Sequence, residues 1–317
     1  MRNISQSGTC VLASRVFLGV VLSLAVAGSS GCSLRTIALR SLADSVADPG
    51  DTYARDDDPD LVRGALPVML KIMETLRDGL PDHKGIRLGL VRSFTSFGVG
   101  FVQDDADRLT EKNVQEGQTL YGRGRRLLLR AYQYGLEGLE LAAPGFRKDF
   151  TDHRADAAVA RITKKEDVAL LYWTAAALGS AIACSKGDMK LVGDLPLVEK
   201  LMTRALALDP DFDEGALHEF FVTYDMTLGT GRGGGPIEAK KHYLRALELS
   251  KNKKLGAHVT YAESVLVELQ HKEEFVKVLE GVAKADVDAD LPHRLVNVLA
   301  QRRARWLLSR TDELFAN

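Results

Sequence analysis

The spacing of large and small residues between positions 205 and 246 constrains the fold of this chain most strongly. The middle of this segment carries large residues at the helical spacing i, i+3, i+4 and i+7: Leu217, Phe220, Phe221 and Tyr224. A second set, Ala239, Tyr243 and Ala246, gives small-x₃-aromatic-x₂-small. The two helices of a tetratricopeptide repeat carry these patterns, because small residues let paired helices approach closely. We therefore predict stacked helix pairs.

Helical periodicity extends over nearly the whole chain. Asp58-Pro59 is typical of a helix start, because the acid can cap the helix and proline fits its first turn. Further helices are predicted over 86–101, 104–141, 166–185, 195–208, 213–227, 236–250, 255–269, 271–284 and 291–309, and the long one would break at Gly122 or Gly124. No run has the sustained alternation of a strand, so we predict an all-α fold.

Three glycines, Gly229, Gly231 and Gly234, spell the G-x-G-x-x-G of dinucleotide-binding loops. Such a loop follows a strand, and an acid ends the next strand about 20 residues later. Here the preceding segment has helical period, and Glu248 lies inside a predicted helix. From Ala205 to Ala246 the chain counts 41 residues, where a repeat takes about 34.

The residues in excess of the usual repeat length fall on the segment with these three glycines. We therefore predict that this segment is a loop between two paired helices. Alanine at Gly231 or Gly234 should then cost little unless the glycine has a positive φ.

The N-terminus has the features of a secretory signal. Residues 16–27 are apolar, and Arg2 and Arg15 precede or flank them. The segment before Cys32, Ser29-Ser30-Gly31, resembles a bacterial lipobox, although leucine is usual where Ser29 stands. We predict a signal over 1–31, a lipid on Cys32 and one domain over 32–317, with an ordinary cleavage site as the alternative. Ser33 rather than aspartate favours the outer membrane.

Charge and cysteine content exclude several classes of protein. Removing residues 1–31 takes away two arginines and changes the net formal charge from −1 to −3, which gives no basic face for nucleic acid. No later segment is long and apolar enough to span a bilayer. Cys184 is then the only cysteine besides the anchor, and it fits a buried apolar thiol better than a nucleophile.

Motifs for metals and cofactors are incomplete. His218-Glu219 begins the zinc motif H-E-x-x-H, but Val222 stands where the second histidine is needed. The seven histidines form no close pairs in sequence, and the acidic run 56–58 lacks calcium-loop spacing. We expect no metal, no cofactor and no catalytic residue. Arg302 and Arg305 lie on a late predicted helix. They form either a solvated helix face or a contact surface for a partner or an anionic ligand.

Several segments together resemble the TatT family, the T component associated with TRAP transporters. In chain order they are DDDPDLVRGALPVMLK, YWTAAALG, LPLVEKLMTRALALDPDFDEGALHEF, the GGGP loop, AKKHYLRALELS, VTYAES and RLVNVLAQRRARWLL. The similarity runs from about residue 32 to the C-terminus and lies in the order and spacing of the segments.

The resemblance implies a periplasmic lipoprotein that forms a homotrimer. It also implies an apolar hole through each protomer and a partner, the substrate-binding P subunit of the transporter. The T component would dock this subunit or hand it a small organic acid or hydrophobic ligand. Candidate cavity residues are Tyr172, Trp173, His218, Phe221 and Asn297, each of which also fits an ordinary buried position.

Two other function classes remain open. Tetratricopeptide-like repeats also serve as scaffolds for the assembly of envelope proteins. A hydrolase or oxidoreductase is disfavoured, because triad, metal and nucleotide patterns are missing. Neighbouring genes for a P subunit and a permease would support the transport interpretation.

Overall fold

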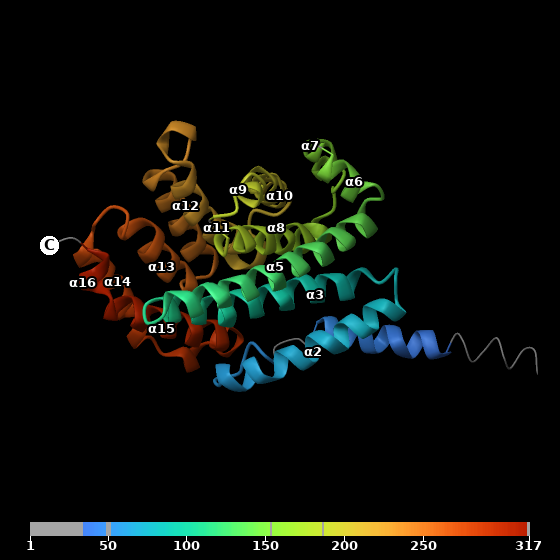
Figure 1. Cartoon of the computed structure of the whole chain (residues 1–317), viewed down its shortest axis with the longest axis horizontal. Helices are drawn as coiled ribbons and strands as arrows, with labels where there is room; N and C mark the ends of the chain where they lie inside the picture. The colour runs from blue at the N-terminus through green and yellow to red at the C-terminus, as the bar shows by residue number, and fades with distance from the viewer. Residues whose placement is uncertain (1–33, 49–51, 153, 186, 316–317) are drawn as a thin grey trace, which may run out of the picture.

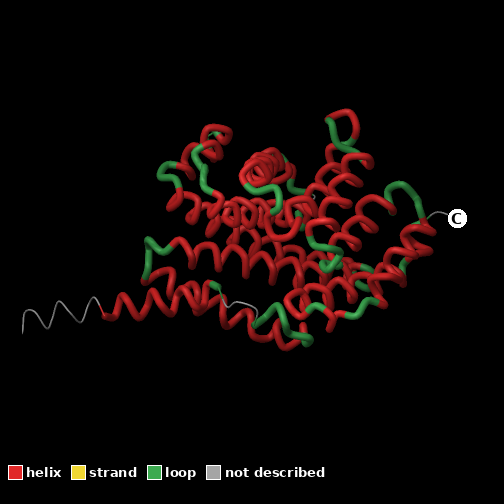
Figure 2. The backbone as a smooth tube through the Cα atoms, turned by 180° about the vertical axis from the view of Figure 1, so that it is seen from behind, coloured by secondary structure: helices red, strands yellow, loops and turns green. Residues whose placement is uncertain are grey.

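The structure is a computed structural model that describes residues 34–48, 52–152, 154–185 and 187–315. Within these ranges every regular element is a helix and no strand occurs, so the all-α prediction is confirmed (Figure 2). None of the described helices has the length and hydrophobicity needed to cross a bilayer. The predicted signal over 1–31 and the anchor Cys32 lie outside the described residues.

Long helices in the first two thirds of the chain pack side by side in sequence order (Figure 1). They are α2 (Pro59–Gly79), α3 (Lys84–Phe97), α5 (Val114–Ala142), α8 (Val168–Ala183) and α10 (Leu195–Leu208). α3 lies between α2 and α5, and α8 lies between α5 and α10. Their facing sides form the larger of two hydrophobic clusters.

The start of α2 agrees with the helix start predicted at Asp58-Pro59. Asp58 Oδ1 accepts hydrogen bonds from the backbone nitrogens of Asp60 at 3.0 Å and Leu61 at 3.1 Å. Pro59 occupies the first turn, where its missing N–H leaves no bond unmade. The acidic run therefore serves as a helix cap, as expected.

The predicted helix over 104–141 is two helices, and its break lies elsewhere than predicted. α4 (Asp104–Thr110) ends before α5, and Asn113 caps α5 by accepting a bond from Glu116 N at 3.2 Å. At Gly117 a Cβ would come within 2.7 Å of Thr110 Cα, so the glycine allows a tight turn between the two helices. Gly122 and Gly124 lie inside α5 without interrupting it.

The predicted repeat is formed by α11 (Ala216–Leu228) and α12 (Pro236–Leu249), which pack against each other. Ala239, Tyr243 and Ala246 are buried between elements, as predicted. Gly215, with a φ of 97°, comes so close that a Cβ would lie 2.9 Å from Ala246 Cα. Small residues therefore set the distance between these backbones.

The glycine loop connects this helix pair, as predicted. It follows a helix, not a strand, and Gly229, Gly233 and Gly235 have positive φ angles of 67°, 83° and 99°. Gly231 has open space around it, but a Cβ on Gly234 would lie 2.4 Å from the carbonyl oxygen of Asp225. The expectation that alanine is tolerated at Gly234 is therefore wrong, for a reason other than φ.

The C-terminal part returns to the N-terminal helices. α14 (Lys272–Lys284) packs on α15 (Arg294–Ser309), and both contribute to the second hydrophobic cluster. Leu295 N donates to Ala54 O at 2.9 Å, which fixes the start of α15 beside the segment before α2. The shorter helices are α6 (Phe146–Thr151), α7 (Ala155–Ala160), α9 (Met189–Val192), α13 (Gly256–Tyr261), which continues as a π-helix over Ala262–Leu266, and α16 (Thr311–Leu314).

Candidate ligand-binding site

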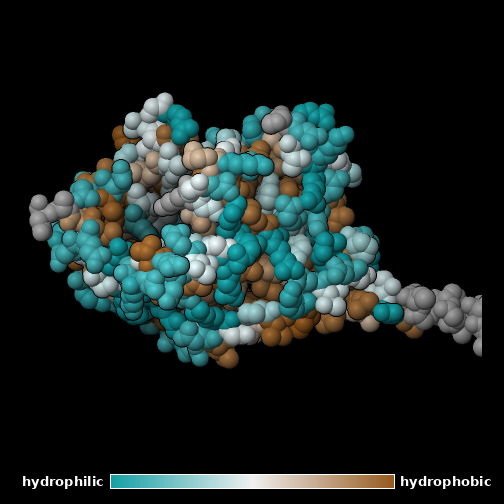
Figure 3. Space-filling view, viewed as in Figure 1, coloured by the Kyte–Doolittle hydropathy of each residue, from teal (hydrophilic) through white to brown (hydrophobic). Residues whose placement is uncertain are grey.

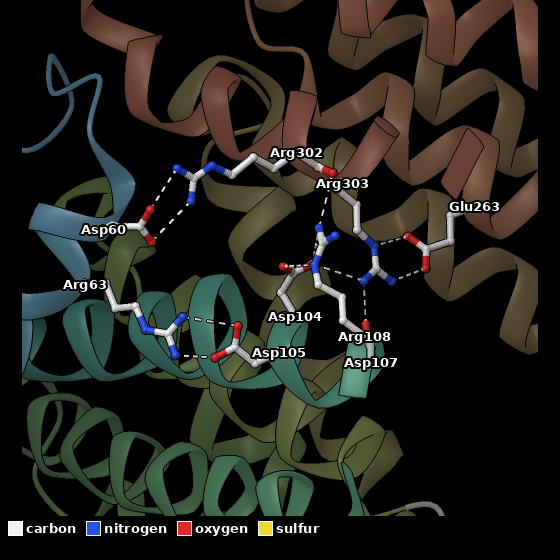
Figure 4. Close-up of polar contacts among 9 residues, drawn as sticks. All are labelled: Asp60, Arg63, Asp104, Asp105, Asp107, Arg108, Glu263, Arg302 and Arg303. Carbon is white, nitrogen blue, oxygen red and sulfur yellow. Dashed lines mark hydrogen bonds and ion pairs between the residues drawn. The ribbon is translucent and has the colours of Figure 1, made fainter. Parts of the chain in front are cut away.

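Arg303 on α15 is the centre of an ion-pair network (Figure 4). Its Nη1 donates to Asp107 Oδ2 at 2.6 Å and to Asp104 Oδ1 at 3.2 Å, both on α4. Its Nε donates to Glu263 Oε2 at 3.2 Å, on the π-helix that follows α13. Burial lowers the pKa of Arg303, but the facing carboxylates of Glu263 and Asp107 outweigh it, so the pKa is raised. The guanidinium is permanently charged and fixed in position.

The network extends to α2, so it connects α2, α4, α15 and the π-helix Ala262–Leu266 (Figure 4). Arg108 Nε donates to Asp104 Oδ2 at 2.7 Å, and Arg63 Nη1 on α2 donates to Asp105 Oδ1 at 3.1 Å. Arg302, a predicted partner contact, has an exposed side chain whose Nη2 lies 3.1 Å from Asp60 Oδ2. Neighbouring arginines thus have different roles, one half-enclosed and one on the surface.

Trp306 lies one turn after Arg303 among three guanidinium groups. The distances from its ring centroid to the guanidinium carbons of Arg303, Arg310 and Arg108 are 4.2, 4.9 and 5.4 Å. Such contacts are attractive because the ring face carries negative partial charge. The Nε1 of Trp306 is buried and has no hydrogen-bond partner among the described residues.

Two cavities meet at the Arg303 network. Their volumes are about 950 and about 600 Å³, and both are lined by Gln103, Asp107, Glu263 and Arg303. The shared residues form the partition between them. Both volumes lie in the range of small-molecule sites, which is about 300–1,000 Å³.

The larger cavity has mostly polar and charged walls. They include Thr110, Glu111, Gln118, Tyr121, Arg125, Ser185, Asp188, Trp306 and Arg310, from α4, α5, α15 and the segment after α8. Seven buried side-chain polar atoms of the described residues lack a hydrogen-bond partner, and four belong to this lining: Gln103 Oε1, Arg125 Nε, Ser185 Oγ and Trp306 Nε1. Polar walls differ from the apolar hole that the family resemblance implies.

The smaller cavity is lined in part by apolar side chains, those of Val99, Val259, Val296 and Leu299. Its polar lining includes Glu219, whose Oε1 accepts a bond from Thr260 Oγ1 at 3.0 Å. Burial raises the pKa of Glu219 although this bond lowers it. This cavity offers apolar contact beside a protonatable acid.

Comparison with known proteins identifies the family. The family model described as TAtT, TRAP transporter T-component, matches residues 55–315. The chain belongs to this family. An uncharacterized protein of Treponema pallidum (strain Nichols) is 28% identical over 303 residues, which cover 90% of this chain and 94% of that protein. The chain is thereby assigned to the accessory T components of TRAP transporters.

The five predicted cavity residues of this T component lie in three separate places. Tyr172 and Trp173 on α8 contact each other edge to face, with ring centroids 5.1 Å apart, and Phe212 lies 5.4 Å from Tyr172. Burial raises the pKa of the Tyr172 hydroxyl. Neither Tyr172 nor Trp173 lines either of the two described cavities.

His218 and Phe221 on α11 meet His242 on α12. The Nδ1 atoms of the two histidines are 2.7 Å apart, and the Phe221 ring stacks on His242 at 5.0 Å. Burial lowers the pKa of both histidines. No group of three or more candidate metal ligands occurs in the described parts of the chain.

Asn297 and Arg305 both lie on α15 and differ in their contacts. Asn297 Oδ1 accepts from Leu255 N and its Nδ2 donates to Lys253 O, each at 2.9 Å, so the amide fixes the turn before α13 against α15. Arg305 is exposed and donates to Gln301 Oε1 at 3.1 Å. The exposed position leaves Arg305 accessible to a partner.

Sequence reasoning missed most residues of the Arg303 network and its cavities. Asp107 and Arg303 are separated by 196 residues, and no motif spacing relates positions so far apart. A usable signal was the complementarity of two short runs, acidic at 104–107 and basic at 302–305. Cys184 lines the larger cavity, and its burial raises the pKa of the thiol to about 11, which keeps it protonated.

Proposed function

We propose that this T component binds a small ligand in the cavities around Arg303 and transfers it to, or receives it from, the P subunit of a TRAP transporter. The observation that carries the proposal is the pair of cavities that share Gln103, Asp107, Glu263 and Arg303. Family membership supports the link to TRAP transport. A protein of this kind acts by binding and needs no catalytic residue.

The four shared residues support ligand handling, because they line two cavities whose walls differ in chemistry. One cavity offers hydrogen bonds and the other has a partly apolar lining. A ligand that reaches both would contact Arg303 and Glu263, which come from distant parts of the chain. Any movement of α15 relative to α4 would then change both cavities at once.

The proposed location is the periplasm, with a lipid on Cys32 that holds the protein at the outer membrane. The leader-like residues 1–31 and the segment before Cys32 support this proposal. Acyl chains would provide a membrane affinity that the net charge of the chain does not provide.

A homotrimer is part of the proposal, and an apolar surface supports it. Exposed large apolar side chains occur on the segment 34–48, at Leu34, Ile37 and Leu42, and on α2, at Leu61, Val68 and Ile72. Apolar atoms gather along the lower edge of Figure 3, where Figure 1 places α2. Contiguous exposed apolar patches mark contact surfaces in soluble domains.

The test is copurification with the P subunit encoded by the same organism. A tagged copy of this chain should retain the P subunit after detergent extraction of the envelope. Arg305→Glu should reduce the retained amount, because it reverses the charge of an exposed candidate contact. Arg126→Glu is the matched control, since Arg126 is an exposed arginine on α5.

Recovery of envelope-assembly proteins in place of the P subunit would favour the scaffold interpretation. Equal retention by the wild type and both variants would remove Arg305 from the contact surface but leave the association intact.

A further inference from the structure

We propose that the smaller cavity binds a small primary amine in its ammonium form, with an aliphatic chain attached to the charged group. The inference rests on the proposed function and names the ligand chemistry of one of its two cavities. Its basis is an accessible carboxylate oxygen in the lining, the negative charge of the lining as a whole, and the apolar residues of the same cavity.

Glu219 on α11 is the acid that would hold the ammonium group. It lines the cavity, and its Oε1 accepts a hydrogen bond from Thr260 Oγ1 at 3.0 Å, whereas its Oε2 has no partner among the described residues. The residue is half-buried, and Oε2 is not among the unpartnered polar atoms that are shut off from solvent. A ligand in the cavity can therefore reach this oxygen.

No lysine, arginine or histidine in the described parts of the chain forms an ion pair with Glu219. Lys254, whose charge acts on it, is engaged with Asp213, and Asp213 Oδ1 lies 2.8 Å from Lys254 Nζ. Burial raises the pKa of Glu219, and the hydrogen bond from Thr260 and the charge of Lys254 offset only part of this shift. An ammonium group beside Oε2 would stabilise the ionised form, because opposite charges attract more strongly where water is scarce.

The charge of the lining disfavours an anionic ligand. The lining contains four carboxylates and two arginines, which gives a formal charge of −2. Both arginines are already paired. Arg302 Nη2 lies 3.1 Å from Asp60 Oδ2, and Arg303 is held by Asp107 and Glu263. A carboxylate ligand would therefore find no free cation in the described lining and would face an excess of negative charge.

Hydroxyl groups near Glu219 provide further acceptors for an ammonium group. Glu219 and Thr223 lie one turn apart on α11. Thr260 and Ser264 have the same spacing on α13 and the π-helix that continues it, which pack against α11. Thr223 Oγ1 and Ser264 Oγ are 2.9 Å apart, and all four residues line the cavity. An ammonium group has three N–H donors, which the carboxylate oxygen and these hydroxyls can accept.

The apolar residues of the cavity favour an aliphatic part in the ligand. Val99 and Val296 have 38% and 51% of their surface exposed, and Leu299 lies three residues after Val296 on α15. An aliphatic chain that covers these side chains gains binding free energy from the apolar area removed from water. The cavity volume of about 600 Å³ is large enough for an amine such as n-hexylamine.

Three probes with the same chain length and different head groups test the proposal by calorimetry on the purified protein. They are n-hexylamine, 1-hexanol and hexanoate, at about pH 8, where a primary amine remains protonated. We expect saturable binding of the amine, weaker binding of the alcohol and the weakest binding of hexanoate. Glu219→Gln should weaken the amine by about tenfold or more and leave 1-hexanol nearly unchanged, because only the amine loses a charged partner.

Glu268→Gln is the matched control, because it makes the same change at an exposed glutamate outside the lining. It should leave the affinity for the amine unchanged, and thermal unfolding should show that both variants are folded. Val296→Lys is a second test, which leaves Glu219 intact. It adds a positive charge at an exposed position of the lining, so it should weaken n-hexylamine and should not weaken hexanoate.

The proposal is overturned if n-hexylamine does not bind, or if 1-hexanol or hexanoate binds as tightly. It is also overturned if folded Glu219→Gln keeps the wild-type affinity for the amine, or if Glu268→Gln weakens the amine as much as Glu219→Gln does. Should Glu219→Gln fail to fold, unchanged binding of the amine by Val296→Lys overturns it.

P-subunit copurification with the same variants separates this inference from the proposed function. Retained P subunit without amine binding contradicts only the ligand class. Amine binding without P-subunit association contradicts the transport role and leaves the site in place.

Discussion

At the scale of single residues, buried polar atoms determine the behaviour of this protein more than any sequence motif does. Arg302, Arg303 and Arg305 read alike in sequence, yet Arg303 alone lies among three carboxylates. Helical spacing cannot show which face is covered by α4, because that contact depends on distant parts of the chain. The exposed positions of Arg302 and Arg305 agree with the solvated face that the sequence indicates.

The pairing of His218 with His242 could not be predicted from spacing either. Motif rules search for ligands within one helix, and these residues lie on two helices that the glycine loop brings together. His218 follows the buried Leu217 on α11 and His242 precedes the buried Tyr243 on α12, and only the packing of the two helices brings the imidazoles together.

Asp225 supplies a pH-dependent prediction at the same scale. Burial raises its pKa from 3.8 to about 6, and nearby Glu238 adds to the shift. The folded state therefore binds this proton more tightly, so its contribution to stability is present below about pH 4 and is lost as pH rises through about 6. Asp225→Asn should raise the free energy of unfolding by on the order of 1–3 kcal/mol at about pH 7.5.

Urea unfolding of both proteins at about pH 7.5 and about pH 4 checks this prediction. The advantage of the asparagine variant should largely disappear at the lower pH, where the carboxyl of the folded state is protonated and resembles the neutral amide. Asp225 Oδ2 lies 3.8 Å from His242 Nε2, so the same comparison in a His242→Gln background separates the titration of the carboxyl from that of the imidazole. An advantage that is equal at both pH values would contradict the account.

At the scale of elements, the helix pair is the part of the fold that sequence predicts best. The small-x₃-aromatic-x₂-small spacing and the surplus of residues at the glycines are local signals, and the structure confirms both. The break predicted at Gly122 or Gly124 is wrong, because the chain breaks earlier, between α4 and α5, where Asn113 caps α5. A glycine does not by itself mark the position of a helix break, since Gly122 and Gly124 lie within the continuous helix α5.

Ala246→Trp tests the packing of this pair. Gly215 and Ala246 are in close backbone contact, so a large ring at position 246 must push α12 away from the start of α11. We expect a loss of about 1–3 kcal/mol or more, as for other overpacked cores. Thermal and urea unfolding measure it, with Leu244→Trp, an exposed position on the same helix, as the control.

An unchanged melting temperature for Ala246→Trp, or an equal loss for the two tryptophan variants, would argue against the repeat register.

The glycine loop provides a second test at this scale. Gly231→Ala should change stability by less than about 0.5 kcal/mol, since nothing lies within 4 Å of the added Cβ. Gly234→Ala should cost at least about 1 kcal/mol, because its Cβ would collide with the Asp225 carbonyl oxygen and Leu228 Cβ. Urea unfolding distinguishes the two, and equal losses would contradict the loop geometry.

At the scale of the whole molecule, the Arg303 network connects helices from both ends of the chain. α15 contacts α2 through Arg302 and α4 through Arg303, and two cavities lie on either side of Arg303. The fold class and the family follow from the sequence. The position and polarity of the cavities do not, because they depend on the assembly of segments far apart in the chain.

Arg303→Met and Arg302→Met form a matched pair for this network. Loss of Arg303 leaves Asp107 and Glu263 facing one another without this partner in a partly exposed place, so we expect about 1–3 kcal/mol of destabilisation. Loss of Arg302 removes an exposed pair and should cost no more than about 1 kcal/mol. Urea unfolding gives both values, and similar losses would show that the network does not stabilise the molecule as described.

The central claim is that this T component acts by associating with a P subunit. Native mass spectrometry of the purified protein, alone and mixed with the P subunit of the same organism, tests it most directly. The account predicts a homotrimer alone and an additional species that contains both proteins in the mixture. Two proteins that keep separate masses when mixed at about 10 μM, a concentration above the Kd of an association worth about 8 kcal/mol, would contradict it.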